Sequence, residues 1–233
     1  MPSTRGTSGT SPGRTCSSAE NRSNVTNSVP RLAAALASRG VSLVYAADGS
    51  EALSYLLQRI PPGARVMNGG SATLEQIGFL DVLRGGRYAW LRPAIAAVED
   101  RAERIRVRRQ ATTADWLVGG VNAITMGGEI VNVDGSGNRL AGYAFGAGRV
   151  ILVAGLNKIV PDLTAAIERI RNTAAVQECR KLALHTPCAV TGRCDNDACR
   201  GPERQCGKIL IIENEKIADR MTVLLVGGSS FGF

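Results

Sequence analysis

The sequence predicts an α/β fold in which helices flank a β-sheet. Short runs of apolar and β-branched residues alternate along the chain with longer stretches whose apolar residues recur at helical spacing. The 233 residues, 44% of them hydrophobic, are also enough for one core of ordinary size. We therefore expect a single α/β domain over residues 30–233.

Residues 1–29 are expected to form a disordered tail. They are rich in Ser, Thr and Gly with scattered Arg, and they contain no apolar run typical of a secretory signal. No stretch of about 18 uninterrupted apolar residues occurs in the chain, so no membrane span is expected. These features predict a cytoplasmic protein, and structural disulfides are rare in that compartment.

The first half of the chain is predicted to contain three strands, each a short apolar run: 41–47, 65–67 and 88–91. Helices are predicted where apolar residues recur every three or four positions: 50–60, 74–84 and 93–109. Ser50 suits the N-cap of the first helix, and Pro93 suits the first turn of the third. Prolines or glycines end the first two.

The second half is predicted to contain short strands and one long helix. The predicted strands are 116–118, 123–125, 129–133, 139–145, 150–154, 209–212 and 223–226. Residues 134–138 read Asp-Gly-Ser-Gly-Asn, so strands 129–133 and 139–145 are expected to form an inserted β-hairpin. A helix is predicted over 162–175, and a Cys-rich loop over 185–207 follows it.

A glycine-rich segment, Asn-Gly-Gly-Ser-Ala-Thr at 68–73, joins a predicted strand to a predicted helix. Glycines allow a ligand to approach the backbone closely, and a helix N-terminus favours an anion. Gly69, Gly70, Ser71 and Thr73 are therefore candidate ligands for a carboxylate or phosphate group. The segment matches neither the Walker loop nor the dinucleotide-binding fingerprint. The alternative is a tight turn in which Ser71 caps the helix.

A second group of polar residues surrounds the predicted hairpin and the strand at 150–154. The candidate ligand-binding residues are Asn122, Thr125, Asp134, Asn138, Arg139 and Asn157. Lys158 could neutralise a carboxylate or phosphate, and Glu129 could act as a base, because the carboxyl ends of strands face the ligand crevice in α/β sheets. The alternative is that these residues serve turns or are solvated.

Four of the six cysteines fall between residues 188 and 206: Cys188, Cys194, Cys199 and Cys206. Cysteine is uncommon in exposed loops unless its sulfur has a role, and thiolates suit zinc or an iron–sulfur cluster. The spacing lacks the close C-x2-C pair that makes such a prediction specific. A metal site, a redox unit and a loop of free thiols therefore all remain open.

The net charge of +8 does not by itself indicate nucleic-acid binding. The strongest basic run, at 101–109, alternates with acidic residues at helical spacing, which favours a solvated helix face. It carries no aromatic residues for stacking on bases, and no nucleic-acid partner is expected.

Four segments resemble a known family. They are GGSATLEQIGFLDVLR from residue 69, ADWLVGGVNAITMGGEIVNVDGSGNR from residue 114, VILVAGLNKIV from residue 150 and TPCAVTGRC from residue 186. They are similar to the LUD-domain family, associated with lactate utilisation, from about residue 41 to the end. The resemblance implies a fold similar to the phosphosugar-isomerase, CoA-transferase and formyltetrahydrofolate-cyclo-ligase group. It also implies a part in oxidation of lactate to pyruvate with iron–sulfur and flavin-type partner subunits.

The chain departs from the family pattern at several positions. Two extra residues separate Cys194 from Cys199, and Val176, Glu178, Lys181 and Gly228 replace the family's usual proline, asparagine, arginine and acidic residue. We therefore expect a LUD-type protein that takes part in 2-hydroxy-acid utilisation as a subunit or accessory of an oxidoreductase complex. The alternatives are a metal- or redox-binding module, and a CoA- or folate-linked transferase or ligase for which Glu129 would supply the carboxylate.

Overall fold

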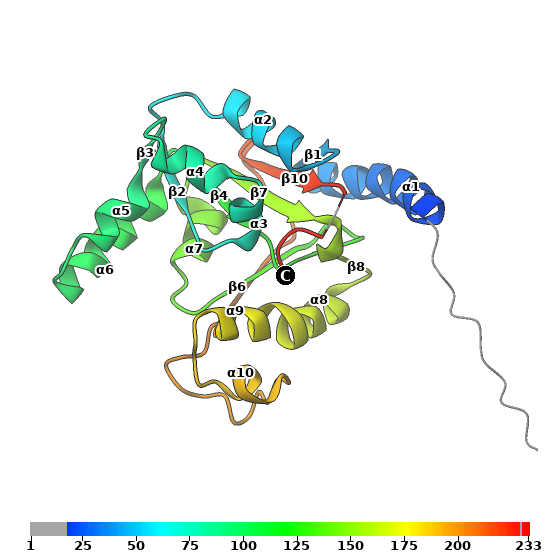
Figure 1. Cartoon of the computed structure of the whole chain (residues 1–233). Coiled ribbons are helices and arrows are strands. Elements are labelled where there is room, and N and C mark those ends of the chain that lie inside the picture. Colours follow the sequence, from blue (N-terminus) through cyan, green and yellow to red (C-terminus); the bar gives the residue numbers. More distant parts are fainter. Residues whose placement is uncertain (1–17, 229) are drawn as a thin grey trace, which may run out of the picture.

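The computed structural model describes residues 18–228 and 230–233, and its centre is a six-stranded sheet (Figure 1). All neighbouring strands of this sheet are parallel. In spatial order they are β1 (Ser42–Ala46), β10 (Met221–Val226), β7 (Arg149–Gly155), β4 (Trp116–Gly120), β2 (Arg65–Asn68) and β3 (Ala89–Trp90). The predicted α/β class is confirmed.

A smaller mixed sheet packs beside the large one. Its strands, in order, are β8 (Ile159–Val160), β5 (Ala123–Thr125), β6 (Ile130–Asp134) and β9 (Lys208–Ile212). The hairpin lies between β5 and β6, which pair antiparallel. The predicted hairpin partner at 139–145 is wrong, because that segment is helical. Its buried residues Leu140 and Tyr143 are three positions apart, which is a helical spacing.

Ten α-helices occur in the described residues. They are α1 (Ser18–Ala37), α2 (Gly49–Arg59), α3 (Ala72–Gln76), α4 (Phe79–Arg84), α5 (Leu91–Ala96), α6 (Arg101–Gln110), α7 (Asn138–Ala141), α8 (Leu163–Arg169), α9 (Ala175–Lys181) and α10 (Pro187–Thr191). Two π-helical turns, Gly142–Gly146 and Ile170–Ala174, continue α7 and join α8 to α9. None of these helices is both long and apolar enough to cross a membrane.

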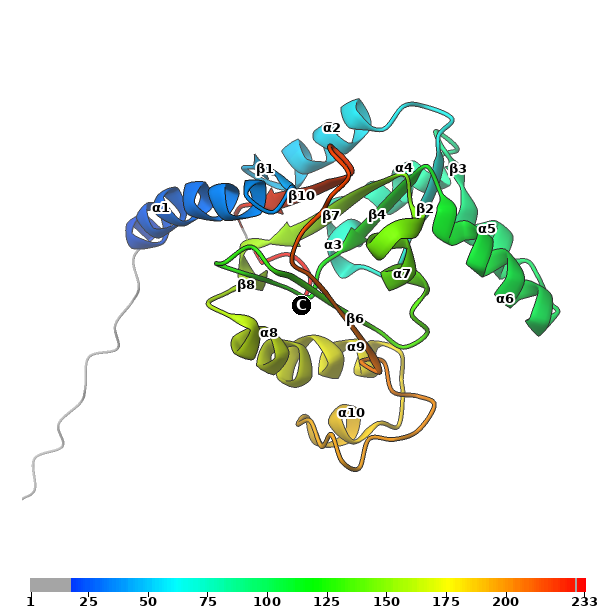
Figure 2. The ribbon, with the colours of Figure 1, turned by 180° about the vertical axis from the view of Figure 1, so that it is seen from behind.

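Alternation along the central strands divides the core into two layers. On β7, Ile151 and Val153 face one cluster with α2, α3 and α4, whereas Val150 and Leu152 face another with α1, α5, α7 and the small sheet. Helix α8 covers the other side of the small sheet. Figure 2 shows the small sheet between the large sheet and the α8–α9 segment. Both faces of the large sheet are therefore covered, as its continuous apolar strands require.

Several predicted helix boundaries differ from the structure. Gly78, at φ +77°, separates α3 from α4, and Asp100 starts α6 by accepting a hydrogen bond from the Glu103 amide. Asp48, rather than Ser50, caps α2. Helix α1 begins at Ser18, so the predicted end of the tail at residue 29 falls inside a helix whose packing positions, including Leu32 and Leu36, come later in the chain.

Candidate functional site

A cavity of about 440 Å³ opens beside the carboxyl ends of β2 and β4. The end of β6 and residues of α5, α6 and α9 complete its wall. This is the edge where parallel α/β sheets bind their ligands. The residues predicted from the sequence that line it are Gly69, Gly70, Ser71, Asn122, Asp134, Asn138, Arg139 and Lys158. Segments distant in the sequence therefore converge on one site.

Asn68, the last residue of β2, is fully buried and positions the glycine loop that follows it. The Trp90 indole donates to Asn68 Oδ1 over 2.7 Å, and Asn68 Nδ2 donates to the Gly69 carbonyl over 3.0 Å. Ser71 Oγ accepts from the Leu74 amide over 3.3 Å and so caps α3. A Cβ on Gly69 would lie 2.8 Å from Arg139 Cδ, so the missing side chain lets Arg139 approach the loop. The predicted N-cap and the predicted ligand-facing loop are therefore compatible.

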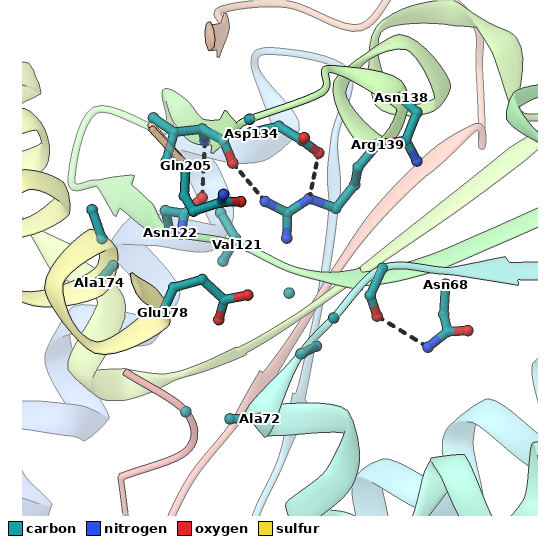
Figure 3. Close-up of a pocket in the computed structure, with 18 of the residues that line it drawn as sticks. Asn68, Ala72, Val121, Asn122, Asp134, Asn138, Arg139, Ala174, Glu178 and Gln205 are labelled. Carbon is teal, nitrogen blue, oxygen red and sulfur yellow. Dashed lines mark hydrogen bonds and ion pairs between the residues drawn. The ribbon is translucent and has the colours of Figure 1, made fainter. Parts of the chain in front are cut away.

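Arg139 projects into the cavity from α7 and is oriented by the end of β6 (Figure 3). Its Nη2 donates to the Val133 carbonyl over 2.6 Å, and its Nε lies 3.5 Å from Asp134 Oδ2. The other Asp134 oxygen accepts from the amides of Ser136 and Gly137, each over 2.9 Å. Asp134 thereby fixes both the turn at 134–137 and the guanidinium, which keeps further N–H donors for a ligand.

Lys158 lies on the cavity wall and is only 3% exposed. Its Nζ donates to Thr73 Oγ1 over 3.1 Å. Burial lowers the pKa of Lys158 to about 7, and the positive charges of Arg169 and Arg139 contribute to the lowering. At neutral pH a large fraction of the molecules therefore carries a neutral amine at this position.

The C-terminal segment forms one wall of the cavity through Gly232 and Phe233. The Gly232 amide donates to Gln76 Oε1 over 2.6 Å, and Asn157 Nδ2 donates to the Gly232 carbonyl over 3.3 Å. A Cβ on Gly232 would lie 3.0 Å from Lys158 Nζ. Thr73 and Asn157, both predicted ligand-binding residues, therefore contact residues of the cavity wall without lining it themselves.

Four charged or polar side chains of the wall were missed from the sequence: Arg92, Arg108, Glu178 and Gln205. Arg92, Arg108 and Glu178 have no side-chain hydrogen bond or ion pair among the described residues. The Glu178 carboxylate points from α9 across the cavity, and a Cβ on Gly70 would lie 3.7 Å from its Oε1 (Figure 3). The only sequence signal was that Glu178 departs from the family pattern.

The structure does not bring Glu129 or Thr125 to this cavity. The Thr125 hydroxyl donates to one oxygen of Glu129, and Arg39 pairs with the other. The hydrogen bond from Thr125 is the main cause that holds the pKa of Glu129 below its usual range, and Arg39 contributes. These contacts tie the turn after α1 to the β5–β6 hairpin.

Helix α10, within the Cys-rich loop, lies on the far side of α9 from the large sheet (Figure 1), whereas Gln205 near the end of the loop lines the cavity. Cys188 is buried with Cys179 and Val176 in a small apolar cluster. Burial raises the pKa of the Cys179, Cys194 and Cys199 thiols, and nearby cysteine sulfurs raise it further. The five cysteines of the described residues are free, and no three His, Cys, Asp or Glu side chains among these residues are arranged to hold a metal ion.

The sequence matches a protein family, and the fold is similar to that of a solved structure. A model of the LUD domain matches residues 29–226. The chain is also similar to the crystal structure of a DUF162 family protein from Deinococcus radiodurans, with a TM-score of 0.51 and 15% identity over 87% of this chain and 98% of that one. At this identity the likeness concerns the fold. No curated protein matches the chain.

Proposed function

Because this chain belongs to the LUD-domain family, we propose that it takes part in the utilisation of lactate or a related 2-hydroxy acid. In this proposal the cavity binds a small carboxylate-bearing ligand, and the protein acts as a subunit or accessory of an oxidoreductase complex. Its partners would be iron–sulfur subunits of the kind that the family resemblance implies.

The observation that supports the proposal most directly is the position of Arg139. Its side chain is largely buried, faces the cavity, and is only partly occupied by Val133 and Asp134. A guanidinium offers planar paired donors that match a carboxylate. The same wall carries Lys158, Arg92 and Arg108 against two carboxylates, Asp134 and Glu178. The balance of charge favours an anion.

The size of the cavity is consistent with a small acid but does not restrict the ligand to one. Lactate and pyruvate have six non-hydrogen atoms each, and at roughly 30 Å³ for each atom, the volume of one water molecule, they need under about 200 Å³. The cavity of about 440 Å³ is larger. A larger anion, or an acid together with a second molecule, would therefore fit.

The test is isothermal titration of the full chain with lactate, pyruvate, CoA and nucleotides, together with growth of a deletion strain on lactate. We expect heat of binding for lactate or pyruvate and a growth defect on lactate. No heat with these acids and normal growth would overturn the proposal.

CoA-linked group transfer is a second candidate, because Glu178 places a carboxylate without a partner opposite Gly70. Such a carboxylate could form a covalent intermediate with an acyl group. Binding of CoA, and turnover that is lost in Glu178→Gln, would favour this candidate. The carboxylate predicted for this role, Glu129, has no position in the cavity.

The metal site proposed for the four loop cysteines needs a separate experiment. Anaerobic purification followed by elemental analysis and visible absorbance would detect bound zinc or an iron–sulfur cluster. Stoichiometric metal that is lost in Cys199→Ser would support the site. Metal-free protein with titratable thiols would remove it.

A further inference from the structure

Lys158 differs from the other lysines of the chain. The sequence contains four, and the remaining three, Lys181, Lys208 and Lys216, are exposed. Lys158 is 3% exposed and its amine faces the cavity. A lysine is rarely buried to this extent unless a carboxylate pairs with it.

No carboxylate among the described residues lies within ion-pair distance of Lys158 Nζ. Its one side-chain hydrogen bond goes to the neutral Thr73 hydroxyl over 3.1 Å. The charged groups that act on it most are the guanidiniums of Arg169 and Arg139. The surroundings of this amine therefore disfavour its protonated form.

Thr73 and the glycine loop fix where the amine sits. Thr73 is fully buried at the start of α3, directly after the loop that lines the cavity. A Cβ on Gly120 would lie 3.9 Å from Nζ, and one on Gly232 would lie 3.0 Å from it. The absence of a side chain at Gly232 therefore lets the C-terminal backbone approach the amine closely. A desolvated amine beside other cations is an activated nucleophile toward carbonyl groups.

We propose that Lys158 forms an imine with the carbonyl group of an anionic carbonyl compound of the 2-oxo-acid class, whose carboxylate is bound by Arg139. This proposal rests on the carboxylate site proposed above, because Arg139 and Lys158 line the same cavity. It assigns separate roles to the two side chains: the Arg139 guanidinium binds the carboxylate of the ligand, and the neutral amine of Lys158 reacts with its carbonyl carbon.

The step is balanced without a further reagent. The lone pair of neutral Nζ forms a bond to the carbonyl carbon, and the carbonyl π electrons move to the oxygen, which takes one proton from the nitrogen. The resulting carbinolamine loses its oxygen as water with the second amine proton. A C=N double bond then joins the ligand to Lys158. Water released in the cavity can leave because the cavity is open to solvent.

The experiment is reductive trapping on the full chain at neutral pH with pyruvate and sodium borohydride, followed by peptide mass spectrometry. We expect the reduced pyruvate adduct on Lys158, with about tenfold or more labelling over any exposed lysine, because exposed amines are protonated at this pH. Lactate, which has the carboxylate but no ketone group, should compete and lower the labelling. Acetone, which has no carboxylate, should label poorly.

Two variants complete the test. Lys158→Arg should abolish the adduct, whereas Lys216→Arg, at an exposed position, should leave it unchanged. The mapping on the wild-type chain stands even if Lys158→Arg fails to fold. Titration heat with pyruvate but no adduct on Lys158 would overturn the imine and leave the proposed function intact. Absence of both heat and adduct would overturn the two together.

Discussion

The cavity and the Cys-rich loop differ in how their polar residues are brought together. The cavity draws its residues from β2, β6, α5, α6, α9 and the C-terminal segment, which are spread between residues 67 and 233. The loop gathers four cysteines within nineteen residues, from Cys188 to Cys206. Only some residues of the first can be recognised in the sequence, whereas the second is its most conspicuous feature.

The two regions also differ in how they shift the pKa of their titratable groups. In the cavity, burial and the neighbouring guanidiniums lower the pKa of Lys158. The Arg139 side chain faces the cavity. In the loop, burial raises the pKa of Cys194 and Cys199, so their thiols stay protonated at neutral pH. The Cys-rich loop, whose cysteines are close in the sequence, therefore holds thiols that stay protonated. The cavity, whose residues converge from distant segments, holds a lysine with a lowered pKa and a charged arginine.

The largest expected effect concerns the stability cost of the buried amine. The pKa of Lys158 is about 7 in the folded chain and about 10.4 for an unfolded lysine, so the unfolded chain binds more protons between these values. Stability from this group therefore rises with pH across that window, by at most about 1.4 kcal/mol per pH unit. In urea unfolding, the free energy of unfolding of the wild type should therefore rise relative to that of Lys158→Met from about pH 7 to about pH 10.

The matched control is Lys216→Met, whose curve should run parallel to that of the wild type. The comparison uses differences between variants because other groups titrate in the same range; burial, for example, raises the pKa of the Cys194 and Cys199 thiols above that of an unfolded cysteine. If the curve of Lys158→Met also runs parallel to that of the wild type, the pKa of Lys158 is not lowered in the folded chain. The cavity and the Cys-rich loop would then not differ in the way described above.

Removing the guanidinium from the cavity should have the next largest effect. Arg139→Met is expected to weaken binding of lactate or pyruvate by about 10- to 100-fold, because a charge-assisted hydrogen bond contributes roughly 1.5–3 kcal/mol. Arg193→Met removes an exposed arginine from the Cys-rich loop and should leave the dissociation constant unchanged. Titration calorimetry measures both. Equal losses in the two variants would mean that net charge, rather than the cavity, binds the ligand.

A smaller effect is expected from filling the space between the loop and Arg139. The Cβ of Gly69→Ala would meet Arg139 Cδ at 2.8 Å, and the flexible side chain would shift. Affinity should fall by about threefold to tenfold, about 1 kcal/mol, as is usual for a modest packing change. Gly201→Ala is the control in the Cys-rich loop, where a Cβ meets no atom within 4 Å. Unchanged affinity in Gly69→Ala would place the ligand elsewhere in the cavity.

The smallest effect should come from Cys199, and the buried Cys188 of the same loop provides the contrast. Cys199→Ser is expected to alter the free energy of unfolding by less than about 0.5 kcal/mol and to leave ligand binding unchanged. Cys188→Ser should cost about 1–3 kcal/mol, because it places a hydroxyl in the apolar cluster with Val176 and Cys179. Thermal unfolding and titration measure these changes. A tenfold loss of affinity in Cys199→Ser would show that the loop and the cavity form one functional unit, with Gln205 as the connection between them.

The sheet could be predicted from the sequence because its strands are short, continuous apolar runs. β7 and β10 are almost completely buried, and a run of that kind has few alternatives within an α/β chain. The segment at 139–145 was misread because its small and aromatic residues suit a strand as well as a helix. The helical period appears only once Leu140 and Tyr143 are known to be the buried pair.

The site could be predicted only where it follows a strand. The glycine loop follows β2, Asp134 ends β6, and Lys158 comes soon after β7, so all three were found from the rule that ligands bind at carboxyl ends. Arg92 and Arg108 lie on helices where an arginine resembles any solvated side chain. Their contribution depends on how α5 and α6 pack, which no local pattern records.

The C-terminal wall of the cavity has a practical consequence for anyone who prepares this protein. Gly232 is hydrogen-bonded between Gln76 and Asn157, and Phe233 lines the cavity directly. An affinity tag fused after Phe233 would begin inside the binding site and would compete with ligands or displace the wall. Helix α1 contributes no residue to the cavity, so a tag at the N-terminal end of the chain is the better choice for the titration and trapping experiments.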